Sequence, residues 1–261
     1  MKQEGVASKG YSVPNLERAL EIVELLSVNS QGMTLSEIQE CLLFPKSSVF
    51  RIVTTLVERG YLLKNQIDGK FSLSKKFLRI GLSTVDESSI VESSLPYMRS
   101  LRDSLKETIL LGTIIEKRGV VLEQVVGNHG FTFMLTVGKP FYLHSSAPGK
   151  AMIAFLPNEE RDEIIDTITF ESFNEKTISS KKAFLEELKV VKEKGFALDR
   201  AEELEGVHCV GAPVFNQYGY PIAAVWVTAP SARMGLDDLE EVGEKIYGYA
   251  MEISKLYGYD I

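Results

Sequence analysis

The stretch Phe44–Gly60, FPKSSVFRIVTTLVERG, decides the fold of the N-terminal part of the chain. On a helix that starts at Lys46, the apolar residues fall at positions i, i+3, i+4, i+7 and i+8 and form one stripe: Val49, Ile52, Val53, Leu56 and Val57. Pro45 can occupy the first helical turn, where its missing N–H costs nothing, and Gly60 can end the helix. The pattern predicts an amphipathic helix with one buried face.

The opposite face of this helix carries short hydrogen-bond donors and one long cation instead of carboxylates. Its residues are Ser47, Ser48, Arg51, Thr54 and Thr55, with Lys46 at the entrance. Such a surface can lie on phosphates and read base edges in the major groove of DNA. From these residues alone, an ordinary amphipathic surface helix explains the pattern equally well, so the flanking sequence has to decide.

Two shorter helical segments precede this helix. Asn15 can cap a helix that begins at Leu16. The Thr-Leu-Ser-Glu sequence at 34–37 has the spacing of a capping box and starts a second helix that ends near Leu42. Two short helices followed by the helix from Lys46 predict a helix-turn-helix.

Two β-type runs follow Gly60, namely YLLKNQ and KFSLS, and Asp68-Gly69 lies between them. Asp-Gly between two such runs is a strong hairpin signal. A hairpin directly after the helix from Lys46, which would be the recognition helix, predicts a winged helix. Its tip and flanks supply cations for backbone phosphates: Lys64, Lys70, Lys75 and Lys76.

The charge of the chain is unevenly divided. The formal net charge is −7, but residues 1–81 contain 11 Lys and Arg against 8 Asp and Glu, whereas the remainder contains 18 against 28. Within 44–81 the counts are 8 and 2. A cationic patch on an otherwise acidic protein favours one local polyanion-binding surface. Helix face, wing and charge together predict binding to double-stranded DNA.

Length and composition set the broad class. A chain of 261 residues can form one large or two modest domains, and 44% hydrophobic with 25% charged residues is typical of soluble globular proteins. The sequence has no apolar run of about 18 residues and no apolar segment near its N-terminus, so we expect neither a membrane span nor a secretory signal. Cys41 and Cys209 give no disulfide framework, which favours a cytoplasmic protein.

The C-terminal part alternates strands and helices in the manner of an α+β domain with an antiparallel sheet. We expect Pro96 to open an amphipathic helix. Predicted strands are ETILLGTII, VVLEQVVG after an Arg118-Gly119 turn, FYLHS, HCVGAPVFN and PIAAVWVT, and predicted helices are 148–156, 158–166, 181–193 and 236–257. The expected organisation is a winged helix-turn-helix at 12–76, a linker helix at 77–95 and a second domain at 96–259.

Three separated motifs resemble the IclR family of bacterial transcriptional regulators. They are TLSEIQECLLFPKSSVFRIVTTLVERGYL, HSSAPGKAMIAFL and GFALDRAEELEGVHCVGAPVFNQYGYPIAAVWVTAP, and the resemblance covers about residues 15–257. It implies a winged helix-turn-helix, a linker helix and a GAF-like α/β effector-binding domain. It also implies a homodimer or dimer of dimers on a palindromic operator, usually a repressor tuned by a small metabolite.

Two positions depart from the family pattern. The turn before the recognition helix usually carries Gly where this chain has Leu43, and a left-handed backbone is costly for leucine. A small polar residue is common where this chain has Trp226. If the Trp226 side chain faces the ligand pocket, the cavity is smaller and has a stacking wall, which puts the family's usual ligand in doubt.

The run Ser145-Ser146-Ala147-Pro148-Gly149-Lys150 precedes a predicted helix and is built mainly from small residues. Small side chains let a ligand approach the backbone, and a helix N-terminus offers free N–H groups. This predicts a site for a carboxylate or phosphate in which Ala147, Gly149 and the two serines donate. The alternative is a capped helix with Pro in its first turn and no ligand.

The resemblance places further residues at an effector pocket. Asp199 either accepts a hydrogen bond from a ligand hydroxyl or pairs with Arg200 or a backbone N–H. Cys209 is either a small apolar filler of its strand or a pocket residue. Strand alternation makes three residues candidate walls, and two more are candidates for a lid: Val207, Trp226 and Thr228, then Phe133 and Met134.

Enzymatic functions have little support in the sequence. His144 with Ser145 or Ser146 and Asp199 suggests nucleophilic catalysis, but the chain has no Gly-x-Ser-x-Gly elbow. Its three histidines and two cysteines lack metal-ligand spacing, and it has no glycine-rich phosphate loop. We therefore expect no enzyme, metal or cofactor, but a repressor responsive to a small carboxylate. The alternatives are a constitutive DNA-binding protein whose C-terminal domain only oligomerises, and an enzyme or redox sensor that uses Cys209.

Overall fold

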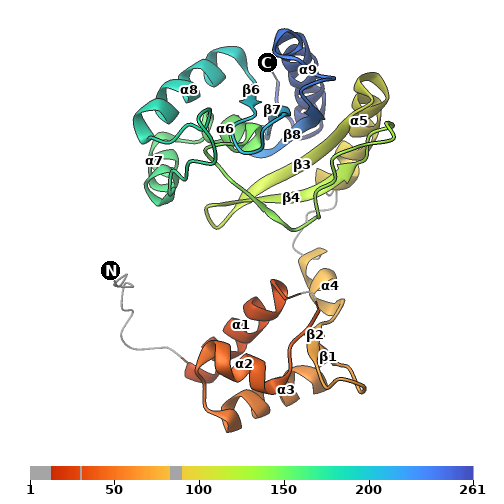
Figure 1. The fold of residues 1–261 in the computed structure, drawn as a ribbon, viewed down its shortest axis with the longest axis vertical. Helices are drawn as coiled ribbons and strands as arrows, with labels where there is room; N and C mark the ends of the chain where they lie inside the picture. The colour runs from red at the N-terminus through yellow and green to blue at the C-terminus, as the bar shows by residue number, and fades with distance from the viewer. Residues whose placement is uncertain (1–12, 30, 83–89, 261) are drawn as a thin grey trace. The chain divides into compact units, whose positions relative to one another are not determined.

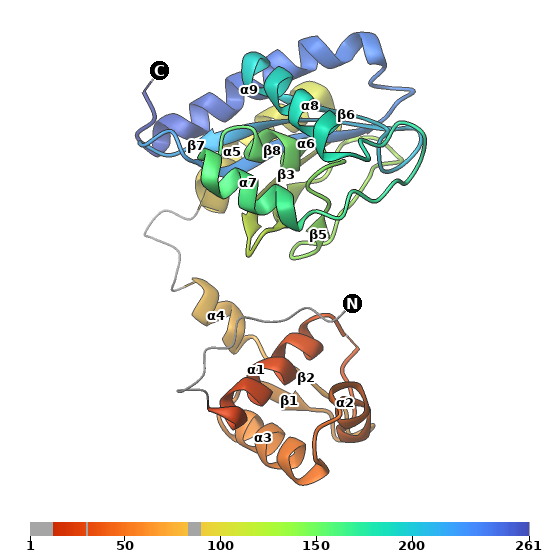
Figure 2. The same ribbon diagram turned by 90° about the vertical axis from the view of Figure 1, so that its left-hand side faces the viewer.

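The computed structural model describes residues 13–29, 31–82 and 90–260 (Figures 1 and 2). The chain divides into two compact units, Met1–Glu87 and Ser88–Ile261. None of the helices in the described ranges combines the length and apolarity that crossing a membrane requires.

The N-terminal unit is a helix-turn-helix followed by a hairpin and a further helix. Its elements are α1 Pro14–Ser27, α2 Leu35–Leu42, α3 Lys46–Glu58, β1 Leu62–Lys64, β2 Phe71–Leu73 and α4 Lys76–Leu82. The predicted apolar stripe of α3 is confirmed, because Val49, Ile52 and Val53 are buried in one core with Ile22 of α1 and Ile38 of α2. This packing fixes which face of α3 points to solvent.

The predicted boundaries of α1 to α3 hold closely, with small corrections. The Thr34 capping box is present, since the Thr34 hydroxyl accepts from the Glu37 N–H and the Glu37 carboxylate accepts from the Thr34 N–H. Asn15 is not the cap of α1, which begins at Pro14 and has no side-chain cap at Val13. Pro45 lies at the N-cap position of α3, one residue before the first turn.

The predicted hairpin is present, but its strands are shorter than expected. β1 and β2 pair antiparallel over three residues. Residues 65–70 form the turn, in which the Asn65 N–H donates to the Lys70 carbonyl at 2.8 Å and the Gly69 N–H donates to the Asn65 carbonyl at 3.0 Å. Gly69 supplies the positive φ of 70° that this turn needs.

The C-terminal unit begins with α5 Ile90–Leu105, and Pro96 lies inside that helix. The prediction that Pro96 opens the helix is therefore wrong. A proline within a helix removes one backbone hydrogen bond. The helix is also held by side-chain packing, because Met98 and Leu101 are fully buried in the domain core.

A six-stranded antiparallel sheet forms the centre of this unit, in the order β5-β4-β3-β8-β7-β6. The strands are β3 Thr108–Ile115, β4 Arg118–Val125, β5 Pro140–Phe141, β6 Ala197–Arg200, β7 Val207–Phe215 and β8 Pro221–Pro230. The helices are α6 Ala147–Ile153, α7 Asn158–Thr167, α8 Lys181–Lys194 and α9 Leu239–Leu256, with the short 3₁₀ helix η1 Leu236–Asp238 before α9. The α+β class and the antiparallel sheet are as predicted.

Alternation along the central strands separates two layers of helices (Figures 1 and 2). In β8, Val225 and Val227 point into the large core that includes residues of α5 and α9. Trp226, between them, points to the opposite face, where it packs with Leu110 and Val121. The start of α6 lies over this second face.

Two strand predictions were wrong in detail. The β3–β4 turn consists of Glu116 and Lys117, both with positive φ (50° and 65°), and Arg118 already pairs with Ile115. Two left-handed residues are what a two-residue hairpin of matching twist requires, although Asn and Gly are the usual occupants. Strand β6 was not predicted, and the candidate FYLHS contributes only Phe141 to β5.

Candidate functional site

The face of α3 opposite the core carries the residues predicted to read DNA. Lys46, Ser47, Arg51 and Thr55 are exposed, and Ser48 and Thr54 are half-buried. The Thr55 hydroxyl donates to the Arg51 carbonyl at 2.9 Å and is thus engaged by its own helix. Among the interactions of the described residues, none involves the Ser47 hydroxyl or the Arg51 guanidinium.

The hairpin presents cations of two kinds. Lys64 is exposed, with its Nζ 5.6 Å from the centre of the Phe71 ring, and Lys70 is half-buried. Hydrogen bonds from Thr34 hold the pKa of the Glu37 carboxyl below its usual value, and Lys70 lowers it further. The ammonium of Lys76 donates to the Arg59 carbonyl at 2.8 Å, so it fixes the end of α3.

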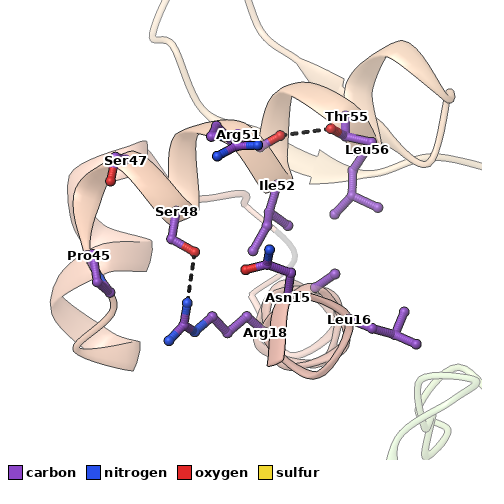
Figure 3. A pocket seen from close by; sticks show the side chains of 11 residues that line it. Asn15, Leu16, Arg18, Pro45, Ser47, Ser48, Arg51, Ile52, Thr55 and Leu56 are labelled. Atoms are coloured by element: carbon purple, nitrogen blue, oxygen red, sulfur yellow. Dashed lines mark hydrogen bonds between the residues drawn. The ribbon is translucent and has the colours of Figure 1, made fainter. Parts of the chain in front are cut away.

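Helix α1 contributes a cation that the sequence did not single out. Arg18 Nη1 donates to Ser48 Oγ at 3.3 Å, and the guanidinium lies 5.5 Å from the centre of the Phe44 ring. Between α1 and α3 is an open groove of about 570 Å³ (Figure 3). It is lined by Asn15, Leu16, Arg18, Ala19, Pro45, Ser47, Ser48, Arg51, Ile52, Thr55 and Leu56.

The C-terminal sheet brings three predicted pocket residues together in a polar row. Asp199 is opposite Cys209, Cys209 is opposite Thr228, and Thr228 is opposite Thr108. Directly opposed residues of antiparallel strands share a face. The Cys209 Sγ and Thr228 Oγ1 atoms are 3.4 Å apart. Val207, two residues before Cys209, is on the same face of β7 and is buried.

Burial disfavours the charged forms of the two titratable groups in this polar row. It raises the pKa of the Cys209 thiol well above its usual value, and the nearby Asp199 adds to that effect. Burial also raises the pKa of Asp199. Asp199 Oδ1 accepts from the Glu202 N–H at 2.8 Å, which is the backbone contact named as one of its two alternatives. Arg200 instead faces Glu187 at 3.5 Å.

Trp226 faces the same side of the sheet as the polar row and occupies space there. It is 2% exposed, and its ring centre is 5.5 Å from that of Phe141. Two glycines make room for it: a Cβ on Gly112 would lie 3.0 Å from the Trp226 ring, and a Cβ on Gly211 would lie 3.1 Å from Trp226 Cβ. Its role as an aromatic wall of an effector pocket stays a prediction.

The start of α6 is a capped helix with Pro148 in its first turn, which is the alternative to the predicted anion site. Ser146 Oγ accepts from the Gly149 N–H at 3.2 Å and donates to the Tyr142 carbonyl. Ser146 and Gly149 are therefore engaged with each other. Ser145 Oγ is buried without a hydrogen-bond partner in the described part of the chain. Of the predicted donors, the Ser145 hydroxyl and the Ala147 N–H remain.

The candidate lid lies next to the polar row. The Thr108 hydroxyl donates to the Phe133 carbonyl at 2.8 Å and accepts from the Gly127 N–H at 3.1 Å. Phe133 packs edge-on against Phe131 with ring centres 5.5 Å apart, and Met134 is 65% exposed. The segment is therefore tied to the sheet by its backbone, while Met134 faces solvent.

A buried ion pair behind the polar row was missed by sequence reasoning. Lys150 is fully buried, with its Nζ 2.5 Å from Glu202 Oε1 and 4.0 Å from Glu187 Oε1. Burial raises the pKa of Glu202 to about 7 against the opposing effect of Lys150. The pair joins α6 to the turn that follows β6, and β6 is the strand that carries Asp199. The available signal was a lysine inside an otherwise small and apolar helix.

Across the described residues, no group of three or more His, Cys, Asp or Glu side chains is arranged to hold a metal ion. The Cys209 thiol is protonated at neutral pH, since its pKa is raised, and a thiol is a weaker nucleophile than a thiolate.

Comparisons with known proteins agree over almost the whole chain. The IclR helix-turn-helix domain matches residues 15–66, and the domain described as bacterial transcriptional regulator IclR C-terminal matches residues 82–255. The HTH-type transcriptional regulator KdgR of Escherichia coli K12 is 27% identical over 248 residues, which cover 95% of this chain and 94% of KdgR. The transcriptional repressor IclR of the same strain is 23% identical, covering 94% and 90%.

A solved structure gives the same result. The IclR protein of Thermotoga maritima superposes with a TM-score of 0.72 at 26% identity, covering 94% of this chain and 99% of that one. These relatives are transcriptional regulators and not enzymes, so the enzymatic alternative based on Cys209 falls away. The chain belongs to the IclR family, and it is a DNA-binding transcriptional regulator.

Proposed function

We propose that the protein is a repressor that binds a palindromic operator as a homodimer or dimer of dimers and responds to a small carboxylate-bearing metabolite. The exposed face of α3 carries the DNA-reading part of this proposal, because its polar residues are held outward by a packed apolar stripe. In a major groove, Ser47 and Arg51 would reach base edges. Lysines of the hairpin, Lys64 and Lys70, would meet phosphates.

A pair of substitutions separates base reading from charge attraction. Arg51→Ala should lower the ratio of operator to random-DNA affinity, because a base contact is lost. Lys70→Ala should weaken binding to operator and to random DNA by the same factor, and it should make both affinities depend less on salt concentration. Fluorescence anisotropy on fragments of the protein's own promoter region measures both. Equal losses on operator and random DNA from Arg51→Ala would count against the assignment of α3.

The effector would bind on the sheet face that carries the polar row, beside the start of α6. What supports this is a group of neutral hydrogen-bonding side chains in one place: the Thr228 hydroxyl, the Cys209 thiol and the unpartnered Ser145 hydroxyl. A carboxylate can accept from such donors. The raised pKa of Asp199 reduces the repulsion that an ionised Asp199 would exert on an anion.

The rival is a constitutive DNA-binding protein whose C-terminal domain only oligomerises, and Trp226 favours it by filling part of the sheet face. A thermal-shift screen with small carboxylic and sugar acids separates the two, because a ligand that binds only the folded state raises its stability. We expect at least one acid to stabilise the protein and to change its operator affinity. Stabilisation by none of them favours the rival. Light scattering on the purified chain gives its oligomeric state.

A further inference from the structure

The groove between α1 and α3 is lined by positively charged side chains and by no carboxylate. Two arginines, Arg18 and Arg51, line it, and no Asp or Glu does. The side chains labelled in Figure 3 come from both helices and from Pro45, just before α3. The groove is open to solvent and about 570 Å³ in volume, which is ample for a phosphate group and its neighbouring sugar. An open, cationic, carboxylate-free groove suits an anion.

Arg18 is held ready for such an anion. One guanidinium nitrogen, Nη1, donates to Ser48 Oγ at 3.3 Å, and the Phe44 ring lies 5.5 Å away. No carboxylate pairs with Arg18 among the ion pairs of the described residues. A guanidinium has five N–H donors, so most of them remain for another acceptor. An arginine fixed by neutral partners keeps its charge for a ligand.

The size of DNA says which part of it would meet this groove. An α-helix with its side chains is about 10–12 Å across and fills a major groove that is about 12 Å wide. A residue that lies beside the recognition helix therefore meets the sugar–phosphate backbone that borders the major groove. Arg18 is such a residue, because it contacts Ser48 at the edge of the exposed face of α3.

We propose that the α1–α3 groove is a phosphate-binding site for one DNA strand, in which Arg18 binds the phosphate and Ser48 positions Arg18. The inference rests on the proposed role of α3 as the helix that enters the major groove. It adds a contact from α1 to those proposed for α3 and the hairpin. Arg18 then fixes how deep and in which register α3 lies, without reading sequence itself.

The test uses Arg18→Gln in the full-length protein, with anisotropy measured on promoter and random duplexes from low to moderate salt. Loss of one phosphate contact should reduce the slope of log affinity against log salt by about 0.9 and weaken both duplexes by the same factor. Arg18→Lys keeps the charge and should retain the slope while recovering only part of the affinity. Arg99→Gln, which removes an exposed cation from α5, is the charge-matched control and should change neither quantity.

Ser48→Ala tests the positioning role, because it leaves the Arg18 charge in place; a loss confined to the promoter duplex would mean that Ser48 reads a base instead. We expect weaker binding with an unchanged salt slope. Circular dichroism melts check that each variant folds. If Arg18→Gln retains the wild-type slope and affinity while Arg51→Ala loses discrimination, the groove binds no phosphate. If neither variant has an effect, the placement of α3 itself is wrong. If Arg18→Gln instead lowers only the oligomeric state, the groove is a protein contact and the proposal is overturned.

Discussion

Lys150 lies in surroundings that are unusual for a lysine, because this residue type is almost never fully buried unless it is paired. Its ammonium is fully buried and faces Glu202 at 2.5 Å and Glu187 at 4.0 Å. Burying a charge is costly unless a partner compensates it, and removing one partner leaves the other uncompensated. The pair therefore holds α6 and the Asp199–Glu202 turn together only while both members are present.

Above pH 7, where Glu202 is ionised, Lys150→Met should lower the free energy of unfolding by about 3–5 kcal/mol, because Glu202 loses its cation inside the domain. Lys189→Met is the matched control, since Lys189 pairs with Glu186 on the exposed side of α8. That substitution should change stability little. Urea unfolding followed by circular dichroism measures both. Similar losses from the two variants would mean that the buried ion pair contributes no more to stability than the exposed one.

Glu202 should also make stability fall as the pH rises. Burial raises its pKa from 4.5 to about 7, so between these values the folded state holds a proton that the unfolded chain releases. The stabilisation from this proton is complete below pH 4.5 and is lost as the pH passes 7. The slope from one such group approaches about 1.4 kcal/mol per pH unit.

The measurement is the difference in the free energy of unfolding between wild type and Glu202→Gln, determined with urea at about pH 5, 6 and 7.5. These values cover the range in which the linked proton is released. Taking a difference cancels the other titrating groups, including His144, whose pKa is lowered by burial. Glu202→Gln should flatten the profile, and Glu193→Gln, on the exposed side of α8, should leave it as in wild type. Parallel profiles for wild type and Glu202→Gln would contradict the raised pKa.

At this scale, sequence found the residues whose position follows from alternation and missed those whose role comes from tertiary packing. Trp226 and Thr228 were placed on one face of their strand because side chains of a strand alternate with a period of two. Lys150 and Arg18 depend on partners 52 and 30 positions away along the chain, and no local pattern marks such pairs. The sequence left Ser146 with two possible roles, a donor to an anion or a cap of its helix; the structure shows its cap to Gly149 and its bond to the Tyr142 carbonyl.

Among the elements, the turn between α2 and α3 carries local strain. Leu43 has φ 55° and ψ 31° and is 87% exposed. Burial of its side chain therefore does not offset the energy cost of the left-handed backbone. A left-handed conformation costs a non-glycine residue about 1–2 kcal/mol. Glycine avoids that cost but loses more conformational entropy, worth about 0.5–1 kcal/mol.

Leu43→Gly should therefore stabilise the N-terminal unit by about 0.5–1 kcal/mol, since relief of strain exceeds the entropy loss. Leu43→Ala is the control, because alanine keeps the strain and should give no comparable gain. Thermal unfolding of the two variants in parallel decides the matter. A Leu43→Gly protein no more stable than Leu43→Ala would show that the turn is not strained.

Elements with a strong local signature were predictable, and those selected by their neighbours were not. α2 follows from its capping box and α3 from its apolar stripe. The β3–β4 turn was misplaced because Glu116 and Lys117 are not residues that usually adopt positive φ. β6 is four residues long and lies at the edge of the sheet beside β7. It is too short to show the alternation of apolar and polar residues that marks a strand.

For the whole molecule, the proposed function depends on coupling between the DNA-binding unit and the effector-binding unit. A ligand changes DNA affinity only if it binds the DNA-competent and DNA-incompetent arrangements with different affinity, however tightly it binds overall. The same linkage makes the effect reciprocal: the factor by which ligand changes operator affinity equals the factor by which operator changes ligand affinity. The polar row and α3 can therefore be tested as the two ends of one equilibrium.

Thr228→Val removes the hydroxyl of the polar row while keeping the shape of the side chain. With an acid that stabilises the wild type, the variant should show a smaller thermal shift and need more ligand to change operator affinity. Its operator affinity without ligand should equal that of wild type, because α3 is unchanged. Thr113→Val is the control, since Thr113 donates to the Ile222 carbonyl at 2.8 Å and is not part of the polar row. If Thr228→Val weakened DNA binding in the absence of ligand, or if Thr113→Val reduced the ligand response equally, the sheet face would not be the effector site.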